Sequence, residues 1–364
     1  MKVLLLSRYT RQGASSRVRS YQFLPYLGAH GVQVTASPLL DEGYLDRLYT
    51  GRPRDYTAVA RAMASRASLL RRAAEFDLLW IEKELFPWLP QWGESLLARS
   101  GIPYVVDFDD AVFHYYDEHR TGFVRRVLGR KIDAVMRGAA VVVAGNEYIA
   151  GRARSAGART VEILPTVVDL DRYRVQPRIP GAPFTVGWMG TPVTAALLDG
   201  VAGVLAEAAR EGDRVVLVGA GAAPPSVRAE VRPWSEAAEV RDIRDFDVGI
   251  MPLPDTPVAR GKCGYKLIQY MAAGRPVIAS PIGANRAIVQ DGVSGFLARD
   301  AGEWRRALRL LRADPELAVR MGRAGRERVE REYSLAVVAP RLLGILRQAA
   351  RGGAACAPSS PAAE

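Results

Sequence analysis

The stretch RGKCGYKLIQYMAAGRPVIASP, residues Arg260 to Pro281, decides the fold of the second half of the chain. A glycine-containing loop leads into the helical pattern KLIQYMAAG, and the apolar run RPVIAS follows as a predicted strand. A loop, a helix and a buried strand in this order are typical of a parallel α/β sheet. The stretch also holds Lys262 and Lys266, two of only five lysines in a chain with 45 arginines.

Lys262 and Lys266 mark a candidate anion site. An ammonium group is a compact point charge that can reach a phosphate or sugar oxygen in a tight pocket. Gly261 and Gly264 allow the backbone to approach a ligand closely, and a helix beginning near Tyr265 would present N–H groups and a positive dipole end. A cation at that end costs up to about 1 kcal/mol unless an anion is bound there. The alternative is that both lysines are ordinary cations on a helix face.

The alternation of apolar strands and helices continues outward from this stretch in both directions. The pattern begins at the N-terminus with KVLLLSRY, and it restarts with FTVGWMG after the proline- and glycine-rich stretch at 176–183, which is typical of a linker. Long arginine-rich helices are predicted from about 301 to 346. Such alternation indicates parallel strands with helices on both faces.

These patterns predict an α/β chain with two doubly wound, Rossmann-like domains facing across a cleft. The predicted domains cover residues 1–178 and 179–335. A C-terminal helix is expected over 336–350, and the composition of residues 351–364 is typical of a disordered tail. Ligands of open parallel sheets bind beyond the carboxyl ends of the strands, so the loops that follow the strands are the places to look for a site.

Composition narrows the classes of partner. The net charge of +11 fits nucleic acid, an anionic membrane surface or a polyanionic small substrate. The arginines are spread along the chain rather than gathered in a recognisable module, so no nucleic-acid partner is expected. With two cysteines and three histidines, the chain offers no metal-ligand spacing, and a reducing, cytoplasmic location is the simplest inference. The apolar run in MKVLLLSRY is too short for a secretory signal and no other run reaches membrane-spanning length, which leaves open a peripheral contact with the inner membrane surface.

The second half of the chain resembles the C-terminal domain of retaining GT-B glycosyltransferases of family 4. The resemblance rests on GKCGYKLIQYMAAG, RPVIAS, PIGAN and DGVSGFL, which have the spacing of that family, and on GIMPL before them. In the first half, PTVVD at 165–169 stands where the family usually has PNGVD, and an early loop contains Gly13. The resemblance covers nearly all of the chain apart from its tail, and it implies that the last helix packs back on the first domain.

The resemblance implies a glycosyltransferase that moves a sugar from a nucleotide-diphosphate sugar to an acceptor hydroxyl. It implies retention of the anomeric configuration and no metal or other cofactor. The acceptor would be a glycan, a lipid-linked carrier or a secondary metabolite. Two other interpretations stay open: a catalytically degenerate partner protein that binds a nucleotide sugar, and a sugar-nucleotide epimerase.

This chain departs from the family at the paired glutamates, which fall on Gly261 and Gln269. Gln269 can still hydrogen-bond ribose hydroxyls, because an amide both donates and accepts. Gly261 has no side chain for the donor sugar. Sugar recognition would then use Lys262 or the backbone N–H groups of Cys263 and Gly264.

A second departure concerns the cations that the family carries after the first strand of this domain. They are replaced here by Thr191 and its neighbours, beside Gly190 as a position of close approach. We therefore predict that Lys262 and Lys266 supply the charge for the diphosphate. Trp234 is predicted to lie near the nucleotide base, with an ordinary packed tryptophan as the alternative.

In the first half, Asp109 stands where the resemblance places a catalytic-side histidine. A carboxylate there could orient an acceptor hydroxyl or accept its proton. The alternative is that Asp107, Asp109 and Asp110 form a loop and a helix cap. A metal site through Asp107 and Asp109 is not expected, because the acidic pair of metal-dependent transferases belongs to a different, single-domain fold. Glu82 and Glu84, at the end of another predicted strand, are candidates for the acceptor side or solvated strand-end charges.

Overall fold

The structure is a computed structural model that describes residues 1–99, 101–176 and 182–354. The chain divides into two compact units, the first formed by Met1–Pro165 with the C-terminal stretch from Val338, the second by Thr166–Val337. The division falls before the predicted boundary at 178, because Val168 pairs with Ser334 in a parallel bridge of the second unit. Most of the predicted linker, and the tail from residue 355, lie outside the described residues.

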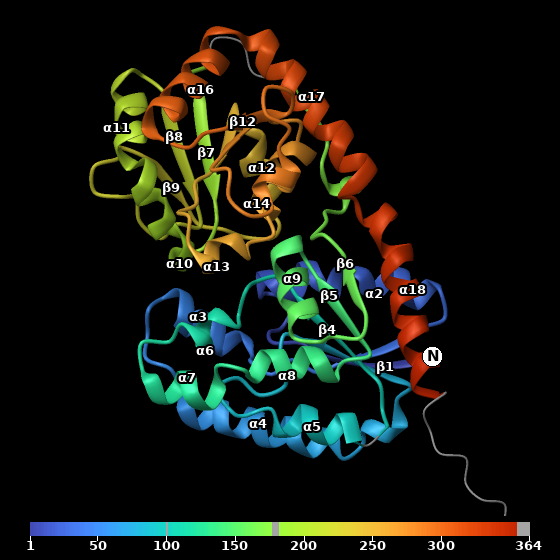
Figure 1. The fold of residues 1–364 in the computed structure, drawn as a ribbon. Helices are drawn as coiled ribbons and strands as arrows, with labels where there is room; N and C mark the ends of the chain where they lie inside the picture. The colour runs from blue at the N-terminus through green and yellow to red at the C-terminus, as the bar shows by residue number, and fades with distance from the viewer. Residues whose placement is uncertain (100, 177–181, 355–364) are drawn as a thin grey trace, which may run out of the picture. The chain divides into compact units, whose positions relative to one another are not determined.

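The first unit is built on a parallel sheet of six strands in the order β2-β1-β3-β4-β5-β6 (Figure 1). Its strands are β1 (Lys2–Leu6), β2 (Gln33–Ala36), β3 (Leu78–Glu82), β4 (Tyr104–Phe108), β5 (Val141–Ala144) and β6 (Val161–Ile163). The four central strands are buried almost throughout, which is why they read as continuous apolar runs rather than as alternating ones.

The helices of the first unit are α1 (Ala14–Arg19), α2 (Leu24–Ala29), α3 (Glu42–Tyr49), α4 (Tyr56–Leu70), α5 (Trp92–Arg99), α6 (His114–Asp117), α7 (Gly122–Leu128), α8 (Lys131–Gly138) and α9 (Glu147–Ser155). Short 3₁₀ turns lie at Tyr21–Phe23 and Ala73–Glu75. Helices α6, α7 and α8 follow β4 in a stretch for which the sequence predicted no helix.

The C-terminal helix α18 (Leu335–Ala354) enters the first unit at Val338. Leu342 and Leu346 are fully buried. Two arginines fix the helix to backbone carbonyls, Arg341 to Ile163 and Arg347 to His30, both at 2.9 Å. The helix extends beyond its predicted end at 350.

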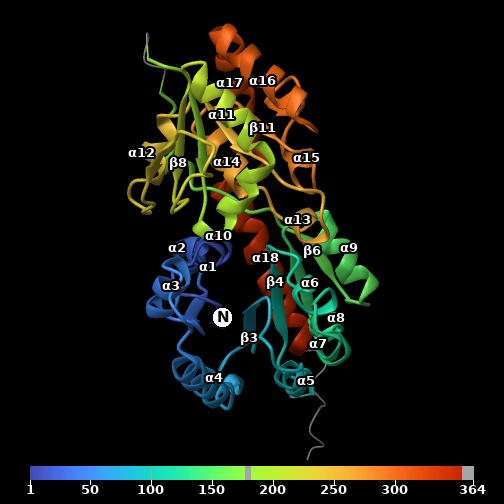
Figure 2. The same cartoon turned by 90° about the vertical axis from the view of Figure 1, so that its left-hand side faces the viewer.

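The second unit has a parallel sheet of six strands in the order β12-β11-β10-β7-β8-β9 (Figure 2). Its strands are β7 (Thr185–Met189), β8 (Arg214–Val218), β9 (Glu230–Arg232), β10 (Val248–Met251), β11 (Val277–Ala279) and β12 (Gly295–Leu297). Its helices are α10 (Pro192–Ala195), α11 (Ala202–Arg210), α12 (Glu239–Arg244), α13 (Pro257–Arg260), α14 (Tyr265–Ala272), α15 (Asn285–Ile288), α16 (Ala301–Ala313) and α17 (Pro315–Glu332), with 3₁₀ turns at Leu170–Arg172 and Ala196–Val201.

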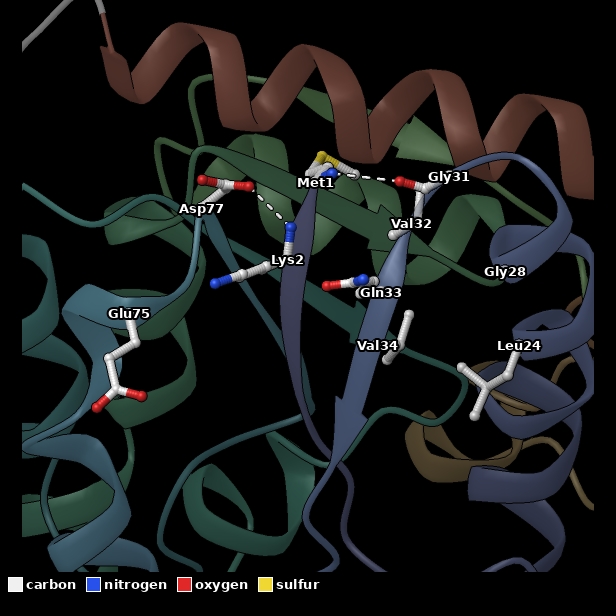
Figure 3. Close-up of a pocket in the computed structure, with 10 residues that line it drawn as sticks. All are labelled: Met1, Lys2, Leu24, Gly28, Gly31, Val32, Gln33, Val34, Glu75 and Asp77. Carbon is white, nitrogen blue, oxygen red and sulfur yellow. Dashed lines mark hydrogen bonds between the residues drawn. The ribbon is translucent and has the colours of Figure 1, made fainter.

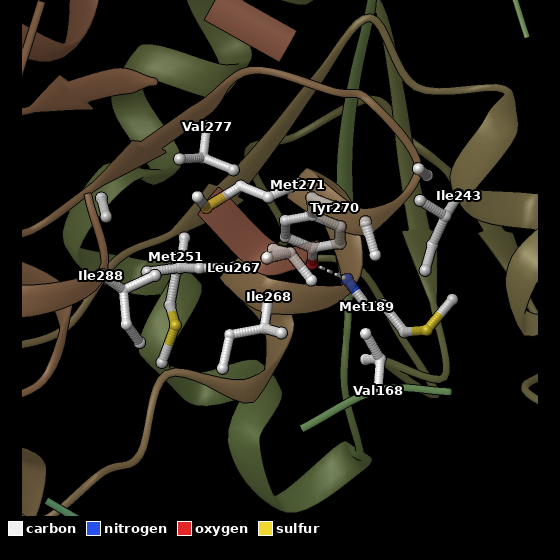
Figure 4. Packing of buried hydrophobic residues seen from close by; sticks show 14 of the residues in the cluster. Val168, Met189, Ile243, Met251, Leu267, Ile268, Tyr270, Met271, Val277 and Ile288 are labelled. Carbon is white, nitrogen blue, oxygen red and sulfur yellow. Dashed lines mark hydrogen bonds between the residues drawn. The ribbon is translucent and has the colours of Figure 1, made fainter. Parts of the chain in front are cut away.

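Helix α14, which the opening stretch predicted, lies against β10 and α17. Its Tyr270 is fully buried and occupies the space above Gly249, where a Cβ atom would lie 2.2 Å from the ring. The backbone N–H of Met189 on β7 donates to the Tyr270 hydroxyl at 2.8 Å (Figure 4). This contact fixes α14 across the carboxyl-terminal half of the sheet.

One helical stretch in the described chain, Pro192–Arg210, is long and apolar enough to cross a membrane, with a mean hydropathy of 1.4. Its α11 portion buries Val204, Leu205 and Ala208 in the core of the second unit and contacts β8. A single stretch of this kind, 28% of it buried, is weak evidence for a membrane span.

Candidate functional site

Lys266 lies at the carboxyl end of β7 in the second unit. Its ammonium nitrogen is 5.4 Å from the centroid of the Trp188 ring, a cation–π arrangement. The far edge of the same ring touches Gly190, where a Cβ atom would lie 2.3 Å from the tryptophan. Thr191 follows directly and caps α10 together with Thr194. The structure thus brings Lys266, Gly190 and Thr191 to one edge of the sheet.

The loop between α13 and α14 carries the other predicted donor-side residues. Lys262 is partly exposed, and its backbone N–H closes the last turn of α13 by donating to Ala259. Cys263 is buried. Gly264 begins α14 with a φ of 68°, in the left-handed region that favours glycine, and a Cβ atom there would lie 2.2 Å from Cδ1 of Ile288. The loop therefore has a defined conformation that presents the start of α14.

Gln269 and Trp234 both have packing partners in the second unit. Gln269 is buried, and its Nε2 donates to the Tyr173 hydroxyl at 3.1 Å. The predicted contact of Gln269 with a ribose therefore gains no support from its position. Trp234 is partly buried, and its Nε1 donates to Glu239 at 3.3 Å. That arrangement favours the alternative prediction, an ordinary packed tryptophan.

Asp109 forms a nearly buried ion pair with Lys83 in the first unit, at 2.8 Å. Burial alone would raise the pKa of Asp109, but the Lys83 ammonium, together with Ser15 and Arg19, outweighs burial and lowers that pKa to about 2. Burial alone would lower the pKa of Lys83, but the carboxylates of Asp109, Asp110 and Glu82 together outweigh it and raise that pKa. A carboxylate with so low a pKa is a weak proton acceptor at neutral pH. The geometry of Asp109 suits the orientation of a neighbouring group by a hydrogen bond better than general-base catalysis.

The backbone at Lys83 has an unusual conformation. Its φ is 65°, and the N–H of Glu84 donates to the carbonyl of Glu82 at 2.8 Å, which makes a γ-turn directly after β3. Turns of this kind are rare and strained, and strained residues cluster at functional sites. The Nζ atom of Lys83 also lies 3.3 Å from the hydroxyl oxygen of Ser15. Ser15 belongs to α1, which begins directly after Gly13. No role was predicted for Lys83 itself, although the scarcity of lysine in this chain could have indicated one.

Three further carboxylates near this edge, those of Asp107, Glu84 and Glu82, are buried and have hydrogen-bond donors. Arg19 binds Asp107 through two hydrogen bonds of 2.8 and 3.0 Å, while burial raises the pKa of Asp107 to about 6 in spite of that guanidinium. Glu84 accepts from Lys131 at 2.6 Å. Glu82 accepts from Ser16, also at 2.6 Å. Glu82 and Glu84 are therefore buried and hydrogen-bonded, and they differ from the alternative prediction of solvated charges at the end of a strand.

The carboxylates of Asp107 and Asp109 are not arranged as metal ligands, because Asp107 faces Arg19 and Asp109 faces Lys83. Over the residues that the structure describes, one cluster has metal-ligand spacing, formed by His114, Asp117 and Glu118. His114 Nδ1 lies 2.9 Å from Asp117, which also pairs with Arg152 at 3.1 Å. A protein cation thus already pairs with one of the two carboxylates of this cluster.

A concave pocket lies at the opposite, amino-terminal edge of the first sheet (Figure 3). Met1, Lys2 and Gln33 line it, and the backbone N–H of Lys2 donates to Asp77 at 2.7 Å. Because ligands of parallel sheets bind at the carboxyl ends of the strands, this pocket is not a candidate site.

The second unit contains a recognisable family signature. Residues 184–314 match the family model described as glycosyl transferases group 1. The matched range runs from β7 to α16 and includes Gly190, Thr191, Lys262 and Lys266.

Curated relatives align with only part of this chain. A D-inositol 3-phosphate glycosyltransferase from Streptomyces avermitilis is 31% identical over 109 residues, 29% of this chain and 21% of that protein. An alpha-maltose-1-phosphate synthase from Mycobacterium tuberculosis is 37% identical over 89 residues, 22% of this chain and 23% of that protein. The chain therefore spans about a fifth to a quarter of the length of the curated relatives it matches.

Solved structures match nearly the whole chain. Sucrose-phosphate synthase from Thermosynechococcus elongatus superposes with a TM-score of 0.73 at 16% identity, covering 96% of this chain and 98% of that one. Anabaena HepE, solved in complex with UDP-glucose, gives 0.70 at 15% identity, covering 95% and 99%. At such low identity the likeness concerns the fold alone, and the predicted GT-B fold with two Rossmann-like domains is confirmed.

Proposed function

We propose that this protein is a retaining, metal-independent glycosyltransferase of family 4 that moves a sugar, for example a hexose, from a nucleotide-diphosphate sugar to an acceptor hydroxyl. One observation carries the proposal: the match to glycosyl transferases group 1 covers the sheet edge where Lys266, Gly190 and the start of α14 lie together. Because HepE was solved with UDP-glucose, uridine-diphosphate sugars are the donors to test first. The acceptor would be a glycan, a lipid-linked carrier or a secondary metabolite, and the location cytoplasmic.

In this proposal, Lys262 and Lys266 stabilise the negative charge that develops on the departing diphosphate. Lys266 suits the task because the Trp188 ring holds its ammonium at the end of β7. The N-terminus of α14 adds backbone dipoles. Preorganised charge of this kind is usually the largest single contribution to catalysis.

On the acceptor side, we propose that Asp109 orients the acceptor hydroxyl by accepting its hydrogen bond. The ion pair with Lys83 keeps Asp109 ionised and fixed in place. Its low pKa argues against a role as the base that removes the acceptor proton.

The test replaces each lysine by alanine and measures turnover of radiolabelled uridine-diphosphate sugars with a panel of acceptors. We expect Lys262→Ala and Lys266→Ala each to lower kcat/KM by about 10²–10³-fold, the usual effect of removing one charge-stabilising group. Arg323→Gln, on the exposed face of α17, is the control and should leave turnover unchanged. Unchanged turnover in both lysine variants would refute their assigned role, and product of inverted configuration would refute retention.

Gly261 favours a second candidate, a degenerate protein that binds a nucleotide sugar without transferring it. Its lack of a side chain leaves the position of the first family glutamate without a carboxylate. A rise in Tm with uridine-diphosphate sugars, without product from any acceptor, would support this candidate, since a ligand bound only by the native state must stabilise it.

A further inference from the structure

The first unit exposes large apolar side chains from two neighbouring segments. The most exposed are Trp92 at 68% and Phe123 at 73%. Together with them, we call the following residues the apolar surface: Trp88, Leu89 and Leu96 from the β3–α5 loop and α5, and Val127 from α7. Isolated exposed apolar residues are normal, but two exposed tryptophans within five residues of sequence need an explanation.

The two segments are joined in the fold. The centroid of the Trp88 ring lies 5.7 Å from that of His119, in the connection between α6 and α7, and the backbone N–H of Trp88 donates to the Tyr116 hydroxyl. Helix α8 contacts both α5 and α7. In Figures 1 and 2, α7 and α8 lie next to each other and α5 lies below them. Trp88 itself has a φ of 65°, so a costly backbone conformation keeps its ring half exposed.

Exposed arginines accompany the apolar residues of α7. The stretch HRTGFVRRVLGRK, residues 119–131, has no Asp or Glu and holds four exposed arginines, while its Lys131 is buried and paired with Glu84. Arg126 and Arg130 are exposed, and Arg125 folds back onto the carbonyls of His119 and Arg120. The stretch FPWLPQWG, residues 86–93, which runs into the first turn of α5, also lacks acidic residues.

The nearest carboxylates do not cancel this charge. Glu94 is buried and accepts from the backbone N–H of Leu85 at 2.8 Å. Asp117 pairs with Arg152, and the exposed Glu118 offsets only one of the four exposed arginines. The surface is therefore apolar and basic at once.

We propose that the apolar surface binds an anionic membrane face. Tryptophan prefers the level of the lipid headgroups, because its ring is apolar and its N–H is polar. The negative surface potential of an anionic leaflet attracts each Arg that lies near it. A second copy of this chain fits less well, because a twofold contact would place the arginines of residues 120–130 against their own copies. This binding is independent of the reaction proposed above.

The test is flotation of the full chain with vesicles of equimolar phosphatidylglycerol and phosphatidylcholine, and with vesicles of phosphatidylcholine alone. We expect binding to the anionic vesicles, much weaker binding to the neutral ones, and loss of binding at high salt. Trp92→Ser with Leu96→Ser should weaken partitioning by roughly tenfold or more, and Arg125→Gln with Arg126→Gln by roughly 20-fold.

Matched controls come from α17 in the second unit. Val319→Ser at an exposed apolar position and Arg323→Gln at an exposed arginine should leave vesicle binding unchanged. Circular dichroism should show all variants folded, since the replaced side chains are mainly exposed. Absence of binding to anionic vesicles at low salt would overturn the proposal. A second result would also overturn it: the Trp92 and Leu96 variant binds vesicles as well as the unaltered chain, but a dimer of the unaltered chain is lost in the variant. That result would assign the surface to a second copy of the chain.

Discussion

At the scale of single residues, the pair of Lys83 and Asp109 controls the acid stability of the first unit. The ordinary pKa of Asp109 is 3.8, and Lys83 lowers it to about 2 in the fold. A carboxylate whose pKa is depressed on folding stabilises the protein above its unfolded pKa, and this contribution is lost as pH falls towards the folded pKa. The relevant window is therefore about pH 4 down to about pH 2.

The variant Asp109→Asn tests this dependence of stability on pH. At neutral pH we expect it to lower the free energy of unfolding by about 3–5 kcal/mol, because Lys83 stays buried without its counter-charge. Near pH 2 the difference between variant and unaltered chain should shrink, because Asp109 is then about half protonated in the folded state and almost fully protonated in the unfolded state. Urea unfolding at both pH values measures it. An equal difference at the two pH values would show that the ion pair is not the cause.

At the scale of elements, Gly264 determines how α14 begins. A non-glycine residue at φ 68° costs roughly 1–2 kcal/mol, and overlap with Ile288 adds about 1–3 kcal/mol. We expect Gly264→Ala to destabilise the second unit by about 2–5 kcal/mol in urea unfolding. Gly151→Ala in α9 is the control, because a Cβ atom there meets nothing within 4 Å and should stabilise by about 0.5–1 kcal/mol. Similar effects of the two changes would contradict this view of the turn.

The elements also show what the sequence could predict. Strands such as LLWIE and VVVA were recognisable because both faces of each sheet are covered, which removes polar positions from the run. Helix α7 was missed because Phe123 and Val127 face outward, so its apolar residues do not mark a core-facing stripe.

The sequence did not predict those properties of the site residues that depend on contacts between segments far apart in the chain. The proximity of Lys266 to the end of β7 followed from loop order in a parallel sheet. The burial of Gln269 did not, because its partner Tyr173 lies 96 residues earlier in the sequence. Lys83 was not predicted as a site residue, because its position depends on a γ-turn and on an ion pair with Asp109, which follows the neighbouring strand β4.

At the scale of the whole molecule, the two units differ in how the chain builds them. The second unit is one continuous stretch, Thr166–Val337, with its own hydrophobic core. The first unit needs residues from both ends of the chain, because α18 supplies part of its core. The buried side chains of α18 in this unit are Val338, Ala339, Leu342, Leu343, Ile345, Leu346 and Ala349.

Ending the chain after Val337 should therefore unfold the first unit and spare the second. Each buried Leu, Ile or Val contributes about 1.5–3 kcal/mol, so the five in α18 together contribute about 10 kcal/mol, comparable with the whole stability of a domain. Hydrogen exchange resolved by peptide should show loss of protection in β1–β6 and retained protection in β7–β12. Leu342→Ala should raise exchange in the first unit alone, by a cost of about 2–5 kcal/mol. If β1–β6 keep their protection without α18, or if β7–β12 lose theirs, then the helix is not an integral part of the first unit's core.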